Sequence, residues 1–171
     1  MVMLHLGTAI SLFLFFSNEW NDIISKLCHG KFHDSHLLYL IIVGTIPAVI
    51  LGFSFEKVLR FMFSNITNAS FFLVLNGFLL CAGEKFRKRG NKTLHELTFK
   101  EAFIIGLFQC LAFIPGFSRS GATITGGFLT GLKHSESLRF SMLLAEPIIL
   151  GAAVVEIPHL IHSNIAGRSE E

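Results

Sequence analysis

Charged side chains are scarce in this chain of 171 residues, where Asp, Glu, Lys and Arg make up 15% of the composition. Soluble domains carry roughly 25% charged residues, so the shortage argues against an ordinary soluble domain. Hydrophobic residues account for 51% of the chain, and 19 of its residues are phenylalanines. The composition therefore predicts a membrane protein that crosses the bilayer more than once.

Strong net charge and paired cysteines are also lacking. The formal net charge is only +2, which gives no indication of a nucleic-acid partner. The cysteines Cys28, Cys81 and Cys110 are far apart and odd in number, so we interpret them as small hydrophobic residues without disulfides. Met1 to Leu14 lacks the basic region and the small-residue cleavage site of a secretory signal peptide.

Long apolar runs predict an all-α integral membrane protein, a multi-pass helical bundle with a single transmembrane domain over residues 1–171. A helix needs about 20 apolar residues to cross a bilayer. We predict spans at about 1–16, 37–55, 69–83 and 140–161. Pro47 is expected to kink its span, and Glu56 to Asn68 is interpreted as a short amphipathic connection.

Residues 102–132 contain two apolar runs that are each too short to cross alone. Ala102 to Ile114 would reach only about 20 Å as a helix before it meets Pro115-Gly116, and Ala122 to Leu132 would return. We predict a re-entrant broken helix, which is tolerated where protein or water covers its loose backbone. Gly127 and Gly131 are expected to let neighbouring helices approach closely.

The sequence between those runs is Pro115-Gly-Phe-Ser-Arg-Ser-Gly-Ala-Thr-Ile-Thr-Gly-Gly127. An arginine at bilayer depth costs about 2.5–3.5 kcal/mol and needs a partner or a polar cavity. A guanidinium beside hydroxyls and flexible backbone suits a tetrahedral oxyanion such as phosphate. The pattern therefore predicts a phosphate site, with an ordinary surface loop as the alternative. The predicted binding groups are Arg119, the hydroxyls of Ser118, Ser120 and Thr123, and the backbone at Gly116 and Gly121.

Isolated polar side chains within the apolar runs have competing interpretations. Glu146 is either a metal ligand or counter-ion of Arg119, or a protonated or cavity-facing carboxyl beside a proline. Glu156 is expected at the membrane interface. Gln109 is a candidate support for the loop, although hydrogen bonding between helices explains both Gln109 and Asn76.

Histidines and basic residues outside the loop receive structural interpretations. Two histidine groups have helical spacing but no matching carboxylate, so we assign them to polar connections rather than a metal site; they are His29, His33 and His36, and His159 and His162. The loop from Lys85 to Lys100 is rich in Lys and Arg, which predicts that it is cytoplasmic and that the first span begins outside.

With these residues in view, the chain resembles the bacterial undecaprenyl-diphosphate phosphatases, the integral-membrane family linked to bacitracin resistance. The matching segments are Phe108 to Gly127, which contains the loop, and Phe140 to Ala152. Leu6-Gly-Thr-Ala and Ile46-Pro-Ala-Val-Ile-Leu-Gly52 also look like the family, so the resemblance covers nearly the whole chain.

The resemblance implies hydrolysis of undecaprenyl diphosphate to undecaprenyl phosphate, the lipid that carries cell-wall precursors, in the bacterial inner membrane. It implies a polyprenyl diphosphate lipid as partner, a homodimer as one option, and a divalent metal, Mg²⁺ or Ca²⁺, as cofactor. Arg119 would stabilise charge on the transferring phosphoryl group. Carried over by position, the catalytic residues would be Ser118, Arg119 and Thr123, and the substrate-binding residues Ser120, Gly116 and Gly121.

The sequence also departs from the family pattern. The family has an earlier segment with paired glutamates and a Pro-Val-Ser-Ser-Thr-Gly-His-type stretch, which supply metal ligands and a histidine or serine, and neither has a match here. Glu146 stands where the family usually has an apolar or small residue. We therefore expect an incomplete form with one of two half-sites and little diphosphatase activity by itself, and the metal ligands stay unidentified.

Two further functions remain open. A non-enzymatic transporter would use the broken helix to bind an anion or a lipid phosphate and move it across the bilayer. A packing module without a site would use the loop only for helix contacts, and it would tolerate replacement of Arg119.

Overall fold

A computed structural model describes the backbone of residues 2–30, 35–54, 66–87 and 90–168, and the side chains of residues 7–30, 35–54, 69–87 and 90–152. The described part is helical and contains no β-strand, which confirms the all-α prediction. Its helices are α1 (Val2–Phe15), α2 (Ser17–Cys28), α3 (His36–Ser54), α5 (Ile66–Arg87), α6 (Phe99–Cys110), α7 (Arg119–Leu129) and α8 (His134–Arg168), with short 3₁₀ turns at Leu94–Glu96 and Leu111–Phe113.

Two of these helices are long and apolar enough to cross a membrane. They are α3, with a mean hydropathy of 2.3, and the Ala69–Arg87 part of α5, with 1.3. They coincide with the predicted spans at 37–55 and 69–83, and α3 continues as a helix through Pro47. The predicted span at 1–16 corresponds to α1, which has 14 residues. The one at 140–161 lies inside α8, which has 35.

Several predictions fall outside the described residues. They concern the side chains of Glu156, His159 and His162, the residue His33, and most of the connection from Glu56 to Asn68. The cysteines are all described and free: Cys28 and Cys81 are exposed, and Cys110 is half-buried. Because Cys28 and Cys81 are exposed, they are not packed in the core.

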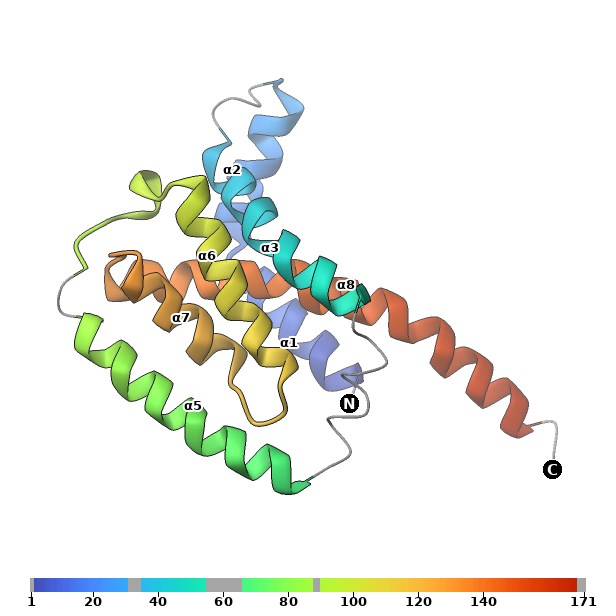
Figure 1. The fold of residues 1–171 in the computed structure, drawn as a ribbon. Helices are drawn as coiled ribbons and strands as arrows, with labels where there is room; N and C mark the ends of the chain where they lie inside the picture. The colour runs from blue at the N-terminus through green and yellow to red at the C-terminus, as the bar shows by residue number, and fades with distance from the viewer. Residues whose placement is uncertain (1, 31–34, 55–65, 88–89, 169–171) are drawn as a thin grey trace.

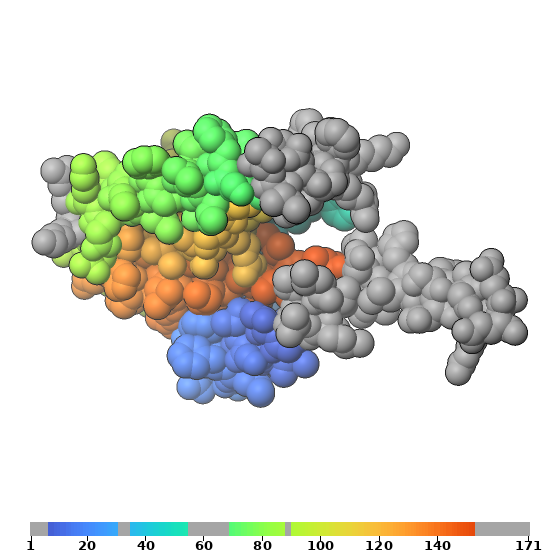
Figure 2. Space-filling view, turned by 90° about the horizontal axis from the view of Figure 1, so that it is seen from below, coloured from blue at the N-terminus to red at the C-terminus, as the bar shows by residue number. Residues whose placement is uncertain are grey.

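Helix α7 lies at the centre of the arrangement, with α5 on one side and α8 on the other (Figures 1 and 2). Helix α1 packs against the far side of α8, and α6 packs against both α3 and α7. The main core joins α3, α6 and α8 through Leu40, Ile41, Ala102, Ile105, Phe140, Leu143 and Leu144. Helices α3 and α6 touch at two glycines, since a Cβ atom at Gly106 would lie 2.2 Å from the carbonyl oxygen of Gly44.

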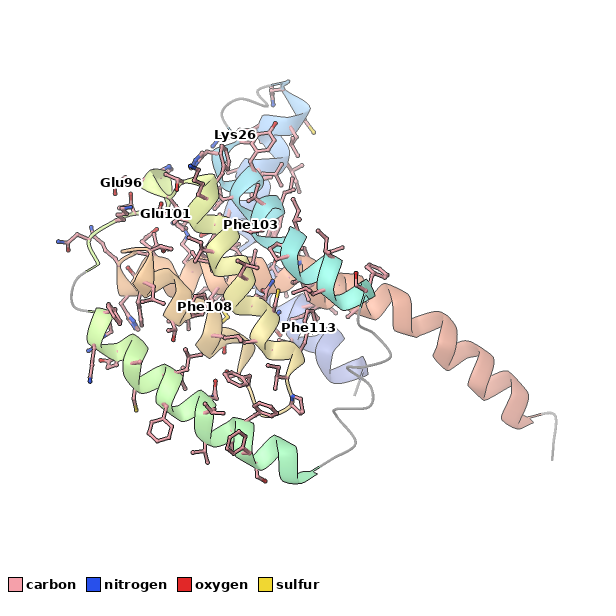
Figure 3. All side chains as sticks on the ribbon, in the orientation of Figure 1. Lys26, Glu96, Glu101, Phe103, Phe108 and Phe113 are labelled. Atoms are coloured by element: carbon pink, nitrogen blue, oxygen red, sulfur yellow. The ribbon has the colours of Figure 1, made fainter. Side chains whose placement is uncertain are left out.

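Helices α6 and α7 form a hairpin of two short helices (Figure 1). They have 12 and 11 residues, so each is only about 16–18 Å long. The open ends of the hairpin are held by Lys92, whose N–H donates to Gly131 O at 3.0 Å and whose carbonyl accepts from Lys133 N at 3.0 Å. Figure 3 shows the charged residues Lys26, Glu96 and Glu101 at this end, and Phe113 towards the turn of the hairpin.

Two details of the hairpin differ from the prediction. The returning helix begins at Arg119, earlier than the predicted Ala122, because Ser118 acts as its N-cap. Gly127 does approach α8, since a Cβ atom there would lie 2.7 Å from Ser137 Oγ. Gly131 instead has φ +86° and follows the end of α7, a position that favours glycine.

Candidate phosphate-binding loop

The turn of the hairpin is fixed by local sequence. The N–H of Phe117 donates to Ile114 O at 3.1 Å and closes a turn with Pro115 and Gly116 in its middle. Gly116 has φ +99°, and a proline followed by a glycine with positive φ is typical of a type II turn. A Cβ atom at Gly116 would also lie 2.3 Å from the carbonyl oxygen of Ala69 in α5. Only glycine satisfies both requirements.

Ser118 connects this turn to α7. Its hydroxyl oxygen accepts a hydrogen bond from the N–H of Gly121 at 3.2 Å and thereby caps the helix. The hydroxyl oxygens of Ser118 and Ser120 lie 3.4 Å apart, and both residues are partly exposed. The N–H of Ser118 donates to Oδ1 of Asn76 in α5 at 3.2 Å. Two serine hydroxyls therefore lie together at the first turn of α7.

Arg119 is the first residue of α7 and is partly buried. Its Nη1 donates to the carbonyl oxygen of Ala145 in α8 at 3.1 Å. A guanidinium has five N–H donors, so this contact orients the group and leaves donors for a ligand. Helix N-termini favour anions because their first N–H groups have no partner within the helix.

Glu146 does not act as the counter-ion of Arg119. The carboxyl group is buried, with 1% exposure, and neither of its oxygens has a hydrogen-bond partner among the described residues. The indole N–H of Trp20 in α2 is close enough to interact with this carboxyl group but does not meet hydrogen-bond geometry. The interpretation of Glu146 as the counter-ion of Arg119 is therefore wrong, whereas its interpretations as a metal ligand and as a protonated or cavity-facing carboxyl beside Pro147 stay predictions.

Thr123 lies one turn further along α7, below the serines. It is buried, with 1% exposure, and its hydroxyl shares a hydrogen bond with Ser141 Oγ of α8. The same hydroxyl is 2.9 Å from Arg119 O and 3.1 Å from Ser120 O. The structure thus places Thr123 in the contact between α7 and α8, behind the groups that face outward at the loop.

The remaining predicted site residues occupy structural positions. The N–H of Gly121 is used by the Ser118 cap, and a Cβ atom at Gly121 would lie 2.7 Å from Leu80 Cδ2 of α5. Gln109 is buried in α6 with 2% exposure, and its amide atoms have no hydrogen-bond partner within the described residues. The structure therefore shows no hydrogen bond from the Gln109 amide to the described residues of the loop, and its role as a support for the loop stays a prediction.

The metal-ligand and pocket candidates of the described residues do not coincide with the loop. Among the described residues, no group of three or more His, Cys, Asp or Glu side chains is placed to hold a metal ion. A pocket of about 290 Å³ lies at the opposite end of the hairpin, where its charges are paired as Lys26–Asp22 and Arg139–Glu19. It contains none of the predicted site residues.

Asn76 and Ser141 are the groups that sequence reasoning did not assign to the site. Asn76 was interpreted as a contact between helices, and the structure shows which group it binds, the N–H of Ser118. The feature of the sequence that could have indicated this role is that Asn76 is a polar amide within an apolar run. Ser141 gave no signal of its own, because a serine in α8 is unremarkable until α7 is placed beside it.

The fold and the loop define a helical membrane protein in which a hairpin of two short helices presents an arginine and two serines at its turn. The chain belongs to the family described as bacitracin resistance protein BacA, whose profile matches residues 1–170.

Curated relatives support this assignment. Undecaprenyl-diphosphatase 2 of Oenococcus oeni is 49% identical over 166 residues, which covers 97% of this chain and 61% of the relative. Undecaprenyl-diphosphatase of Acidiphilium cryptum is 44% identical, covering 98% and 62%, respectively. A second undecaprenyl-diphosphatase 2, from Chromobacterium violaceum, is 47% identical, covering 95% and 60%. The chain thus spans about three fifths of the length of these relatives.

Proposed function

We propose that this protein acts in the hydrolysis of undecaprenyl diphosphate to undecaprenyl phosphate and inorganic phosphate, with the diphosphate bound at the N-terminus of α7. The relatives at 40–49% identity carry the name undecaprenyl-diphosphatase. The structural observation that carries the proposal is the partly exposed first turn of α7, where the hydroxyl oxygens of Ser118 and Ser120 lie 3.4 Å apart and Ala145 O orients the guanidinium of Arg119.

Each of these groups has a role in the proposal. Arg119 donates to phosphate oxygens and stabilises the charge that develops as the phosphoryl group is transferred, a step in which positioning and electrostatics dominate. The hydroxyls of Ser118 and Ser120 bind the same oxygens as donors. Thr123, whose hydroxyl is engaged with α7 and Ser141, positions the first turn that carries Arg119.

The placement in the membrane is also part of the proposal. Helices α6 and α7 are too short to span. Lys92 links their open ends, because its backbone bonds to Gly131 and Lys133 after α7 and its side chain is ion-paired with Glu101 of α6. The hairpin is therefore re-entrant within a multi-pass bundle, with its open end at the cytoplasmic face of the bacterial inner membrane. The loop then lies at depth, where an arginine is retained for function.

A divalent cation is expected from the family resemblance alone, and a homodimer is only one option for the oligomeric state. The described residues provide no set of three His, Cys, Asp or Glu side chains for Mg²⁺ or Ca²⁺, so no step of the proposed reaction is assigned to a metal. When bound in such phosphatases, a divalent cation neutralises charge on the diphosphate. The oligomeric state plays no part in the roles given above.

One contact also fits the alternative of a packing module. The hydrogen bond from Arg119 to Ala145 O joins α7 to α8 and would be present without any ligand. The two functions differ in what Arg119→Ala changes. A packing role predicts lower stability with no effect on anion binding, whereas a phosphate site predicts weaker anion binding in a protein that still folds.

The test is binding of farnesyl diphosphate to the purified protein in detergent, measured by calorimetry. We expect Arg119→Ala to weaken binding about 10- to 100-fold, because hydrogen bonds from a charged donor are lost. Arg139→Ala is the matched control, since Arg139 is ion-paired with Glu19 away from the loop. Equal affinities in the parent and Arg119→Ala proteins would contradict the proposed site.

A further inference from the structure

We propose that Asn76 of α5 is a positioning residue for the phosphate-binding loop, where it replaces the carboxylate of a capping box by a neutral acceptor. The inference rests on the proposed function, because it assigns a residue to the same site. The juxtaposition that carries it is the 3.2 Å contact between Asn76 Oδ1 and the N–H of Ser118, the N-cap residue of α7.

The comparison with α6 shows what is unusual about α7. At the start of α6, Thr98 is the N-cap, and the carboxylate of Glu101 three residues later accepts from the Thr98 N–H at 2.9 Å. This is the ordinary capping box. In α7 the corresponding third residue is Gly121, which has no side chain to reach back to Ser118. The Ser118 N–H therefore needs an acceptor from elsewhere.

Helix α5 explains both the missing side chain and the replacement acceptor. A Cβ atom at Gly121 would lie 2.7 Å from Leu80 Cδ2, so any side chain there would require Leu80 of α5 to shift. One turn earlier on the same helix, Asn76 supplies the oxygen that Ser118 requires. Asn76 is itself buried, with 5% exposure, and a buried amide oxygen without a partner would be costly.

The contacts of α5 with the hairpin follow one face of the helix. Gly116 approaches Ala69 O and Leu73 N, and Thr125 is the neighbour that a Cβ atom at Gly83 would meet at 2.6 Å. Together with Asn76 and Leu80, the contacts recur every three or four residues, which is the spacing of one helical face. Asn76 is the polar member of this face, and it stands where the loop presents a backbone donor.

The choice of an amide has an electrostatic consequence. A capping-box glutamate would place a negative charge at the first turn of α7, which carries Ser118, Arg119 and Ser120. That charge would repel a diphosphate. An asparagine completes the same hydrogen bond without charge, so the N-terminus of α7 remains favourable for an anion. Loop geometry and anion affinity can therefore be separated by substitution at this one position.

The experiment uses Asn76→Leu, Asn76→Asp and the control Gly77→Ala, which has no neighbour within 4 Å of the added Cβ atom. Hydrogen–deuterium exchange of peptides covering 114–121 reports on the Ser118 amide, and calorimetry at pH 8 gives the affinity for farnesyl diphosphate. We expect about 3- to 10-fold faster exchange in Asn76→Leu, from the loss of one hydrogen bond, and parental exchange in Asn76→Asp and Gly77→Ala.

The affinity for farnesyl diphosphate should follow a different pattern from the exchange rates. Asn76→Asp keeps the acceptor but adds a negative charge, and we expect about tenfold weaker binding or more. Parental exchange in Asn76→Leu would overturn the positioning role. If Asn76→Leu unfolds, Asn76→Asp decides alone, and parental affinity in that variant would overturn the requirement for a neutral acceptor. Failure of the proposed function is distinguishable, because it would show as unchanged binding in Arg119→Ala while the exchange result at Ser118 stands.

Discussion

Arg119 of α7 donates a hydrogen bond from Nη1 to the carbonyl oxygen of Ala145 in α8, at a distance of 3.1 Å. This carbonyl acceptor is neutral, although the next residue along α8 is Glu146, whose carboxyl group is buried. A carboxylate partner would neutralise the guanidinium, whereas a carbonyl orients it and leaves its positive charge available. This relationship is what a site for a strongly anionic ligand requires.

In a full-length context, Arg119→Lys should therefore lose most of the proposed diphosphatase activity. An ammonium group is a point charge without the planar fork of donors, so it cannot bind Ala145 O and a phosphate in the same geometry. We expect a loss of about 10²-fold or more in turnover. Phosphate release from undecaprenyl diphosphate measures it, with Arg139→Lys as the control. Near-parental turnover in Arg119→Lys would contradict the role of the fork.

Gly116→Ala should destabilise the hairpin. The residue has φ +99°, and the new Cβ atom would lie 2.3 Å from Ala69 O. We expect a loss of about 2–4 kcal/mol, which combines backbone strain with displacement of α5. Thermal unfolding in detergent measures it. Gly77→Ala, which places a Cβ atom in open space on α5, should be neutral or slightly stabilising. Equal losses in the two variants would point to a general effect of changing glycines.

The pair Thr123 and Ser141 tests whether Thr123 acts on substrate or on packing. Thr123→Val removes one hydroxyl and leaves Ser141 Oγ buried without this partner, at a cost of about 1–3 kcal/mol. Adding Ser141→Ala should recover part of that stability. We expect the double variant to retain anion binding, because Thr123 is buried behind the partly exposed first turn of α7. Loss of farnesyl diphosphate binding in a double variant of parental stability would show that the Thr123 hydroxyl contacts the ligand.

Much of this loop was predictable because its signals are local. Pro115-Gly116 specifies a turn, and Ser118 specifies a helix start, so the sequence places the hairpin to within a few residues. The partners were not predictable. Asn76, Ser141 and the carbonyl of Ala145 lie on α5 and α8, far away in sequence, and only the packing of α7 between those helices brings them to the loop.

The packing partners of the glycines in the loop could not be predicted from the sequence either. Gly116 and Gly121 were expected to bring backbone N–H groups to a phosphate. In the structure, both make room for α5, through Ala69 and Leu80, and the N–H of Gly121 is already used by the cap. A glycine in a sequence reveals that space or conformational freedom is needed, but not which neighbour requires it.

Glu101 should make stability dependent on acidic pH. Its burial raises the pKa, but hydrogen bonds from Lys92 and Thr98 outweigh burial and hold the pKa below the usual value for glutamate. Since the folded pKa is the lower one, its stabilisation is complete above the unfolded pKa and is lost as pH falls through the folded pKa. Glu101→Gln should cost about 1 kcal/mol at neutral pH and should flatten the acid limb of thermal stability. An unchanged acid limb would assign that dependence to other carboxyl groups.

The re-entrant path of the hairpin can be tested by cysteine labelling in intact cells. Lys100 and Lys133 are exposed at the open end of the hairpin. Each is replaced by cysteine in turn, in a background where the native cysteines at 28, 81 and 110 are alanine. If the hairpin enters and leaves on one face, both positions should react with an impermeant reagent from the same side.

Ser54 provides a reference position for the opposite face of the membrane. The ring of His36, at the start of α3, lies 5.5 Å from the ring of Phe99, at the start of α6. The other end of α3 is Ser54, which is exposed. Because α3 is long enough to span, Ser54→Cys should react from the side opposite to Lys100→Cys. Labelling of Lys100→Cys and Lys133→Cys from opposite sides would mean that the segment crosses the bilayer. Labelling of all three from one side would instead show that α3 does not cross.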